Sequence, residues 1–487
     1  MEGENISNSI NTESEQNLQE TNQQLVTQEQ SVQESGNVFQ EEESKNEQEK
    51  ELYMPKKHED NPFVLSLDVS VGPNSFIDNR QPYNEECPPP KYFSNDILLE
   101  PLPVIREDIL KGLKETKQGG LICVDKEAMD KQKGVLVHVF KQLSKVLMQG
   151  LSISHISLPI KIFEPRSSIQ RIVDIWSFAP KFLAKASQIQ DPLERFKQVI
   201  AFALSGIYIG TSQYKPFNPL LGETLQAQFT DGTQIYCEHT SHHPPITNFL
   251  MQPPDNSYEF YGHYEFTGSM GANHLKTSLK GPNNIVFKDG QHIRFRVPEF
   301  QLGGTVMGER TIETTGNVVF EDLTNNYKAV IILGTYKRHG YFRVTETGSK
   351  DEIQGMIYEY SPYINKLSFQ KTLYNDKIIG ISEIGQISDS IRNICEISGS
   401  WLRQIFIGGD LYWNIEKDIP NRQIPKTQTN QDDIIIAPSD WRFREDLIWL
   451  KYDCMDIASE WKHRLEEQQR YDRKLRNEKR EQRLKET

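Results

Sequence analysis

The sequence predicts an α+β protein in which helices precede and follow a large antiparallel sheet. Three observations support this fold class. Helical periodicity occurs before residue 210 and returns from residue 440 to 485. Between them, short aromatic and β-branched segments alternate with Gly, Asn and Asp turns, which is typical of consecutive antiparallel strands. The regular strand–helix alternation of a parallel sheet is missing, so we expect a near-complete barrel, which with this many strands is wide enough to hold a ligand.

The acidic charge is concentrated at the N-terminus. The 487 residues carry a net charge of −13, and the first 60 contain 15 acidic and 4 basic side chains. The remainder is nearly neutral, with 53 acidic and 51 basic side chains. Residues 1–60 are rich in Glu, Gln, Asn and Ser and cannot bury enough apolar surface to offset their chain entropy. We expect a disordered acidic tail, which is a candidate docking arm for protein partners.

The composition also argues against several classes of protein. A general nucleic-acid binder needs a surplus of Lys and Arg, which this chain lacks. Five scattered cysteines without a CxxC pair argue against a zinc cage and a disulfide framework, and they fit a reducing cytosol. We find no signal peptide, and the longest apolar run, residues 199–209, is far shorter than the ~20 residues of a membrane span. We therefore expect a cytoplasmic protein without a metal or a cofactor.

The region before the sheet divides into two parts. Residues 61–134 are mixed in composition and contain a dense group of prolines, which predicts an extended linker. From residue 135 to 151, apolar side chains recur at helical spacing between polar ones, which predicts an amphipathic helix. Its apolar positions include Leu136, Phe140, Leu143 and Leu147. The pattern alone is consistent with a core-facing helix or with a movable element that touches membranes.

Strands are predicted from residue 225 onward. The Asp-Gly turn at residues 231–232 joins segments 225–229 and 234–238 into a hairpin, and a second Asp-Gly turn lies at 289–290. The other predicted strands are residues 258–266, 284–288, 291–297, 317–320, 329–333, 341–345 and 352–360. The helical region after residue 440 ends in a highly charged stretch, residues 481–487.

The most unusual stretch is residues 238–245, Glu-His-Thr-Ser-His-His-Pro-Pro. Adjacent side chains in a strand point to opposite faces, which is poor for chelating one metal through both His242 and His243. No companion nucleophile supports a catalytic role. The two prolines fix the backbone after the histidines and hold both imidazoles at a rim. Either the histidines are satisfied within a polar turn, or their N–H groups bind an anionic group such as phosphate.

Two further segments offer cationic and hydrogen-bonding groups. Residues 215–223 form a turn-rich junction in which Lys215 and Asn218 offer donors. Residues 461–470 place a basic, an acidic and a basic side chain on one helix face, with about 40° of drift per step. These side chains are Lys462, Glu466 and Arg470. Taken alone, the first segment is an ordinary surface loop and the second a solvated ladder of ion pairs.

Together, the three segments resemble the oxysterol-binding protein family. Residues 238–245 are similar to the family's EQxSHHPP fingerprint and depart from it at His239. Residues 215–223 resemble its KPxNPxLGE box, and residues 462–470 resemble its K-x3-E-x3-R helix. The similarity runs from about residue 135 to 480, so we expect one family domain over these residues.

The resemblance implies a barrel around a central lipid tunnel, closed by a lid at about residues 135–158. It also implies that the headgroup of phosphatidylinositol 4-phosphate lies at the tunnel mouth. The residues expected to bind this headgroup are Lys215, Asn218, His242, His243, Lys462 and Arg470. Glu223 and Glu466 are expected to support the site, and Glu466 to orient the neighbouring cations, because a carboxylate repels phosphate.

The resemblance further implies a carrier and not an enzyme, because no bond is made or broken. The expected cargo is phosphatidylserine or a sterol, exchanged during transient contact with membranes. Residues 158–159 and 164–167 resemble the phospholipid-carrying branch more than the sterol branch. The alternative is a lipid-sensing regulatory scaffold that acts through protein partners. Histidines with an ordinary pKa of about 6.5 would strengthen phosphoinositide binding as the pH falls through that value.

Overall fold

The computed structural model describes residues 112–132, 134, 158–212, 214–271, 273–339, 345–360, 391–423, 425–427, 437 and 439–486. All of them belong to one compact unit, Tyr83–Thr487. Four predictions lie wholly or mostly outside the described residues: the acidic tail, the linker as far as residue 111, the strand at residues 341–344, and the lid at residues 135–157. The lid residues concerned are Leu136, Phe140, Leu143 and Leu147.

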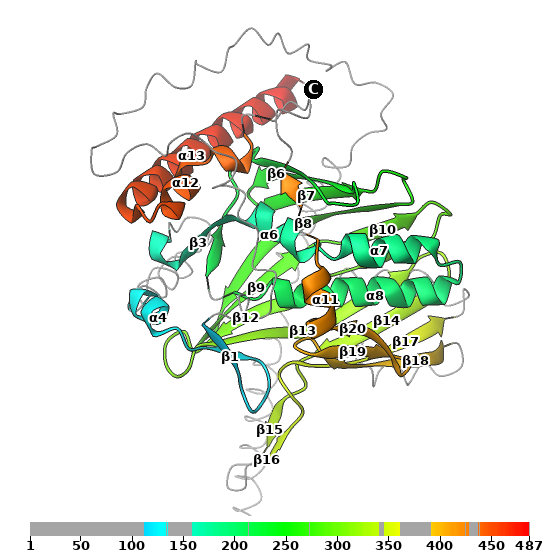
Figure 1. Cartoon of the computed structure of the whole chain (residues 1–487). Helices are drawn as coiled ribbons and strands as arrows, with labels where there is room; N and C mark the ends of the chain where they lie inside the picture. The colour runs from blue at the N-terminus through cyan, green and yellow to red at the C-terminus, as the bar shows by residue number, and fades with distance from the viewer. Residues whose placement is uncertain are drawn as a thin grey trace, which may run out of the picture. The chain divides into compact units, whose positions relative to one another are not determined.

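Over the described residues, the body of the protein is one antiparallel sheet, which contains 17 strands and is drawn in Figure 1. In chain order its strands are β1 Leu113–Glu115, β2 Leu121–Cys123, β5 Thr224–Gln228, β6 Gln234–His242, β7 Pro245–Gln252, β8 Tyr258–Met270, β9 His274–Lys280, β10 Asn283–Phe287, β11 His292–Phe295, β12 Glu299–Gly303, β13 Thr311–Asp322, β14 Tyr327–Leu333, β17 Glu352–Tyr360, β18 Ile391–Ser400, β19 Gln404–Ile407, β20 Asp410–Asn414 and β21 Lys426–Thr427. Two strands outside this sheet, β3 (Phe163–Ser167) and β4 (Lys215–Phe217), form a parallel pair. Another separate pair is β15 (Lys337–His339) with β16 (Thr345–Thr347).

The strand pairing bends the sheet toward a barrel. Consecutive strands pair from β5 to β8, and a second series runs from β13 through β14, β17, β18 and β19 to β20. Between these series the sheet divides. The first half of β8 pairs with β10 and its second half with β9, and β11 and β12 then both pair with β13. The near-barrel antiparallel sheet agrees with the predicted fold class, whereas the central tunnel stays a prediction.

The predicted linker is wrong in its last part. Residues 113–132 form β1, β2 and the helix α4 (Lys126–Gln132). These elements belong to the folded body because Leu121 and Cys123 are buried and β2 pairs with β13. The predicted charged end at residues 481–487 also continues a helix as far as Glu486. Among the described residues, Cys123, Cys237 and Cys395 are free thiols.

The helices form two groups (Figure 1). The first contains α6 Ser168–Ile175, α7 Ala179–Gln188 and α8 Pro192–Ile209, with η2 Ile160–Ile162 before β3. The second contains η5 Trp441–Phe443, α12 Glu445–Lys451 and α13 Met455–Glu486, and is preceded by α11 Ile415–Asp418 and η3 Ile419–Asn421. Asp191 caps α8, because its carboxylate accepts from the backbone N–H groups of Leu193 and Glu194, both at 2.9 Å.

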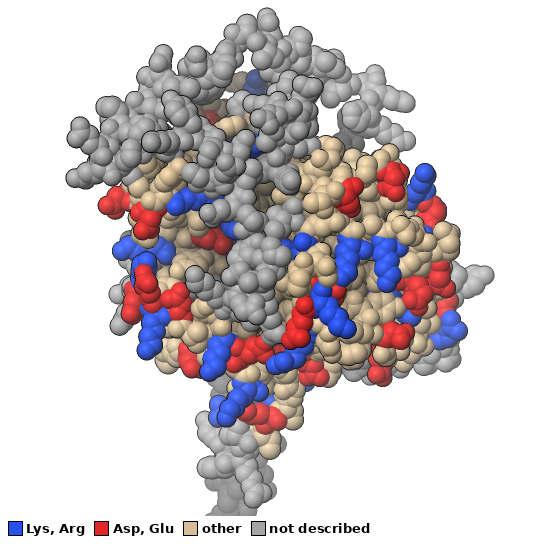
Figure 2. Space-filling model, in the orientation of Figure 1, with Lys and Arg blue, Asp and Glu red and all other residues tan. Residues whose placement is uncertain are grey.

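Two surface properties bear on membranes. Within the described part of the chain, no helix is both long and apolar enough to cross a membrane. Lys and Arg side chains alternate with Asp and Glu on the face that Figure 2 shows. This mixture agrees with the nearly neutral charge of the chain after residue 60.

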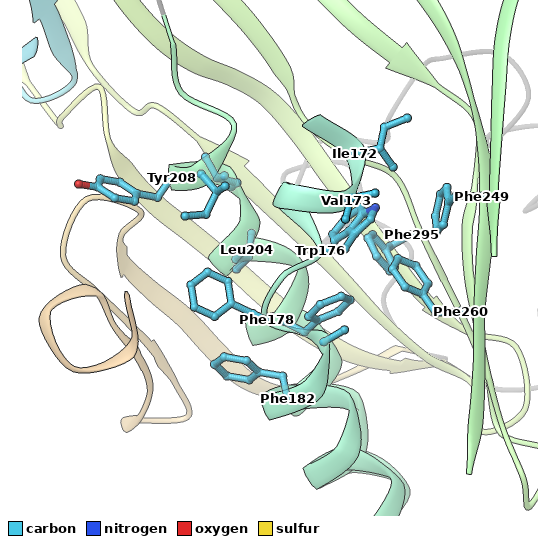
Figure 3. Packing of buried hydrophobic residues seen from close by; sticks show 14 of the residues in the cluster. Ile172, Val173, Trp176, Phe178, Phe182, Leu204, Tyr208, Phe249, Phe260 and Phe295 are labelled. Atoms are coloured by element: carbon cyan, nitrogen blue, oxygen red, sulfur yellow. The ribbon is translucent and has the colours of Figure 1, made fainter. Parts of the chain in front are cut away.

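The core lies between the first helix group and the inner face of the sheet (Figure 3). Trp176, at the end of α6, packs edge-on against Phe260 and Phe295 of the sheet, with ring centroids 5.1 and 6.0 Å apart. Gly206 allows α8 to approach this helix, because a Cβ atom there would lie 2.8 Å from the carbonyl oxygen of Ile175. The glycine that interrupts the apolar run of α8 is therefore required by the packing.

Candidate functional site

A polar pocket lies where the turn after β4, the end of β6 and α13 meet. Its lining residues are Phe163, Phe217, Asn218, Leu220, His242, Arg444, Asp446, Lys462, Glu466, Gln469 and Arg470. Five of the predicted site residues belong to this lining: Asn218, His242, Lys462, Glu466 and Arg470. Lys215 and His243 contact the lining, and Glu223 is buried against it. The fold thus brings together three segments that are far apart in the sequence.

Lys215 is held at the edge of the pocket by oxygen atoms. Its Nζ donates to Asn218 Oδ1 at 2.5 Å and to the carbonyl oxygen of Pro216 at 3.0 Å. Burial and the nearby Lys462 lower the pKa of Lys215 to about 7. In the free protein, Lys215 is therefore only partly protonated at neutral pH, and an anion beside it would favour the charged form.

Two cations of α13 share one carboxylate. Lys462 Nζ lies 2.5 Å from Glu466 Oε1, and the Arg470 guanidinium lies 3.6 Å from Glu466 Oε2. Lys462 is buried, whereas the Arg470 side chain is 43% exposed. Gln469 donates to the carbonyl oxygen of Pro219 at 3.2 Å, which attaches α13 to the turn after β4. Glu466 thus contacts both cations that it is predicted to orient.

His242 ends β6, and His243 begins the turn to β7. Their rings contact each other with centroids 4.5 Å apart and an interplanar angle of 62°. The opposite-face arrangement predicted for a regular strand is wrong here, because the strand ends between the two residues. Burial, together with His243, Arg473 and Arg470, lowers the pKa of His242 to about 4. His242 is therefore neutral near pH 7, and the predicted titration near 6.5 does not apply to it.

Glu223 is buried behind the pocket lining, where it contacts the lining residues Arg444 and Leu220. Its carboxylate accepts from an Arg444 N–H at 2.8 Å, from the backbone N–H of Leu220 at 2.8 Å, and from the hydroxyl of Ser167. Burial raises its pKa, and Arg444 opposes this shift. These contacts tie the turn of residues 218–223 to β3 and to the segment before α12.

Three residues of the site were not predicted from the sequence. Arg444 is buried and bridges Glu223, Asp446 and the carbonyl oxygen of Asn218, with distances of 2.7–2.9 Å. Phe163 forms part of the floor of the pocket, and Arg473 acts electrostatically on His242. The local sequence signal is the mixture of acids and bases at residues 440–446, because opposite charges beside a tryptophan fit a buried ionic network.

The departure from the family fingerprint lies inside the sheet and not in the pocket lining. His239 is 1% exposed, and its Nδ1 lies 2.8 Å from the hydroxyl of Thr247, its cross-strand partner. Burial lowers the pKa of His239 to about 3, so its ring is neutral. Across the described residues, no three or more His, Cys, Asp or Glu side chains form a group that could hold a metal ion. The pocket lining combines three cations, Arg444, Lys462 and Arg470, with the carboxylates of Asp446 and Glu466.

Comparison with known proteins identifies the family. The family model described as oxysterol-binding protein matches residues 138–486. Oxysterol-binding protein 9 of Dictyostelium discoideum is 32% identical over 375 residues, which cover 76% of this chain and 82% of that protein. Human oxysterol-binding protein-related protein 1 is 28% identical over 356 residues, 67% of this chain but only 37% of the human protein.

Two solved structures share the fold. The Osh3 ORD of Saccharomyces cerevisiae in complex with PI(4)P has a TM-score of 0.50 at 22% identity, and the match covers 69% of this chain and 84% of that one. The Osh1 ORD domain in complex with cholesterol has a TM-score of 0.50 at 19% identity, covering 67% and 77%. From the match to the family model and the relative in Dictyostelium, the chain belongs to the oxysterol-binding protein family.

Proposed function

We propose that the protein binds and transfers membrane lipids, and that its pocket holds the phosphorylated headgroup of phosphatidylinositol 4-phosphate. The observation that carries this proposal is the convergence of Lys215, Lys462 and Arg470 with His242 on one pocket. A phosphate monoester carries a charge of about −1.5 to −2 at pH 7 and accepts several hydrogen bonds. The related Osh3 domain in complex with PI(4)P supports this choice of headgroup.

The proposed contacts divide into charges and neutral donors. Lys215, Lys462 and Arg470 supply the positive charge. His242 and His243 donate through ring N–H groups, which neutral imidazoles retain. Asn218 turns its Oδ1 toward Lys215, so its amide NH₂ is the group left for the phosphate. Because Glu466 bonds the α13 cations, it serves to orient them and not to contact the ligand.

We propose that the second ligand is phosphatidylserine or a sterol, exchanged between membranes against the phosphoinositide. The Osh1 domain in complex with cholesterol favours a sterol, whereas residues 158–159 and 164–167 favour a phospholipid. Each buried CH₂ stabilises a bound lipid by about 0.8 kcal/mol, so a lid over the chains would keep the lipid from escaping into water. Native mass spectrometry of the protein purified from cells tests the cargo. Recovery of neither lipid class would contradict the proposal.

In this proposal the protein is a carrier and not an enzyme, acting in the cytosol and at membrane surfaces. No step of headgroup binding or lipid exchange requires a covalent bond to change. Incubation with vesicles that contain phosphatidylinositol 4-phosphate should leave the lipid chemically intact. Appearance of a hydrolysis product in mass spectra, proportional to protein concentration, would contradict the carrier function.

The headgroup assignment is tested by the double variant His242→Ala/His243→Ala in a vesicle extraction assay. Hydrogen bonds to a charged group are worth about 1.5–3 kcal/mol each, so we expect phosphoinositide extraction to weaken by at least about tenfold. His339→Ala is the matched control, because His339 is exposed on β15, outside the pocket lining. Undiminished extraction by the double variant would contradict the assignment.

A further inference from the structure

We infer that Phe163 is a positioning residue of the pocket, whose ring holds the ammonium groups of Lys215 and Lys462 together before an anion binds. This inference rests on the proposed headgroup function and extends it to the ligand-free state. It explains how the ammonium groups of Lys215 and Lys462, which repel each other, stay close together in the ligand-free pocket.

The geometry places both ammonium groups against one ring. Phe163 begins β3, and its register partner in β4 is Lys215, whose Nζ lies 5.1 Å from the ring centroid. Lys462 comes from α13, and its Nζ lies 5.3 Å from the same centroid. An aromatic face carries negative partial charge and attracts a cation within about 6 Å of its centroid. One ring therefore attracts both ammonium groups.

Phe163 is itself fixed by a second ring. It is 7% exposed and packs against Phe217, with centroids 4.5 Å apart and an interplanar angle of 36°. Phe217 in turn lies 5.4 Å from the guanidinium carbon of Arg444. These two rings, Phe163 and Phe217, form an aromatic floor beneath three cations. Aliphatic side chains of similar size would fill the same space without attracting charge.

A neutral aromatic ring suits this site better than another carboxylate would. The charged groups that act on Lys215 are Lys462 and Glu466 of α13, Arg444 before α12, and Glu164 of β3. The two cations oppose protonation of Lys215, and the two carboxylates favour it. A further carboxylate in the position of the ring would hold the lysines but would also repel the incoming phosphate. The ring offsets part of the repulsion between the lysines without adding negative charge to the pocket.

The experiment compares ring electrostatics with packing. Phe163→Leu removes the ring, and replacement of Phe163 by 3,4,5-trifluorophenylalanine nearly keeps its shape but withdraws charge from its face. The probe is soluble inositol 1,4-bisphosphate, measured by calorimetry at pH 7. We expect both replacements to weaken binding by about five- to thirtyfold, as the loss of two cation–π contacts implies. The protonation midpoint of Lys215, followed by NMR in ligand-free protein, should also fall.

Phe320→Leu is the matched control, because Phe320 is fully buried and stacks on Phe295 at 5.1 Å. It should lower the thermal midpoint without changing the affinity or the Lys215 titration. The inference is overturned if the trifluoro variant keeps both the affinity and the titration midpoint of the wild type, even if Phe163→Leu binds weakly. If the wild type itself does not bind the probe, the headgroup proposal fails. The Lys215 titration in ligand-free protein then tests the function of the ring: an unchanged midpoint in the trifluoro variant overturns the inference, and a lowered midpoint supports it.

Discussion

Lys215 is the cation of the pocket whose charge changes near neutral pH. Its pKa is lowered to about 7, first by burial and then by Lys462. A bound phosphate favours the ammonium form and raises this pKa again. Above pH 7, Lys215 must therefore take up a proton when the phosphate binds, whereas well below pH 7 it is already protonated. Below about pH 6 the phosphate itself gains a proton and loses charge. The affinity should therefore be greatest between about pH 6 and 7 and fall as the pH rises.

We expect the affinity for inositol 1,4-bisphosphate to fall by up to about tenfold per pH unit between pH 7 and 9. Lys215→Arg should flatten this dependence, because Arg stays protonated throughout this range. His242, with its pKa lowered to about 4, should contribute little to the slope. Calorimetry across this pH range measures the effect, and Lys474→Arg on the exposed side of α13 is the control. Equal slopes in wild type and Lys215→Arg would exclude Lys215 as the titrating group.

At the scale of elements, Arg444 connects the turn after β4 to the start of α12. Its guanidinium contacts Glu223 at 2.8 Å and Asp446 at 2.7 Å, and all three side chains are at most 5% exposed. A buried ion pair contributes little net stability, but removal of one partner leaves the other charge without compensation in a low-dielectric site. The position of this turn, which carries Asn218, therefore depends on Arg444.

We expect Arg444→Met to lower the free energy of unfolding by about 3–5 kcal/mol, because two buried carboxylates lose their partner. Addition of Glu223→Gln should restore part of the loss. The control is Lys474→Met, whose partner Glu478 lies 3.8 Å away with both side chains more than half exposed, and it should change stability by less than about 1 kcal/mol. Urea unfolding measures all three variants. A loss for Arg444→Met as small as that of the control would contradict the buried-network interpretation.

The strands also show which elements sequence patterns can reveal. The hairpins at β5–β6 and β10–β11 were predicted from their Asp-Gly turns. β5, β6 and β11 alternate buried and outward positions, whereas β10 is buried at four of its five positions. β9 was missed because it has no buried face. β7 was missed because it begins at Pro245, which sequence analysis treated only as the end of β6.

At the scale of the whole molecule, the pocket shows how far local motifs can be used. The resemblance named five of the eleven residues that line the pocket, and the fold brings them together from the turn after β4, the end of β6 and α13. It did not predict that Glu223 acts from a buried position, nor that the two histidine rings contact each other. Phe163 and Arg444 have no motif of their own, because their functions depend on contacts with residues far away in the sequence.

The distribution of charge leads to a prediction about membrane contact. Residues 1–60 carry a net charge of −11, and the rest of the chain carries −2. An acidic tail of this size repels anionic bilayers at low salt, and the effect weakens once the Debye length falls to about 10 Å at 0.1 M salt. We propose that the tail shortens non-specific contact with anionic membranes and leaves headgroup binding unchanged.

Deletion of residues 1–60 should therefore increase co-sedimentation with phosphatidylserine vesicles at low salt, and the increase should disappear as salt is added. A matched variant of the same length, with all Glu and Asp of the tail changed to Gln and Asn, should behave like the deletion, because charge and not length is responsible. Affinity for inositol 1,4-bisphosphate should stay at the wild-type value in both. If only the deletion increases vesicle binding, the tail acts through its bulk. If neither variant binds vesicles more strongly, but both lose their location in cells, the tail is a docking arm for a protein partner and not an electrostatic barrier.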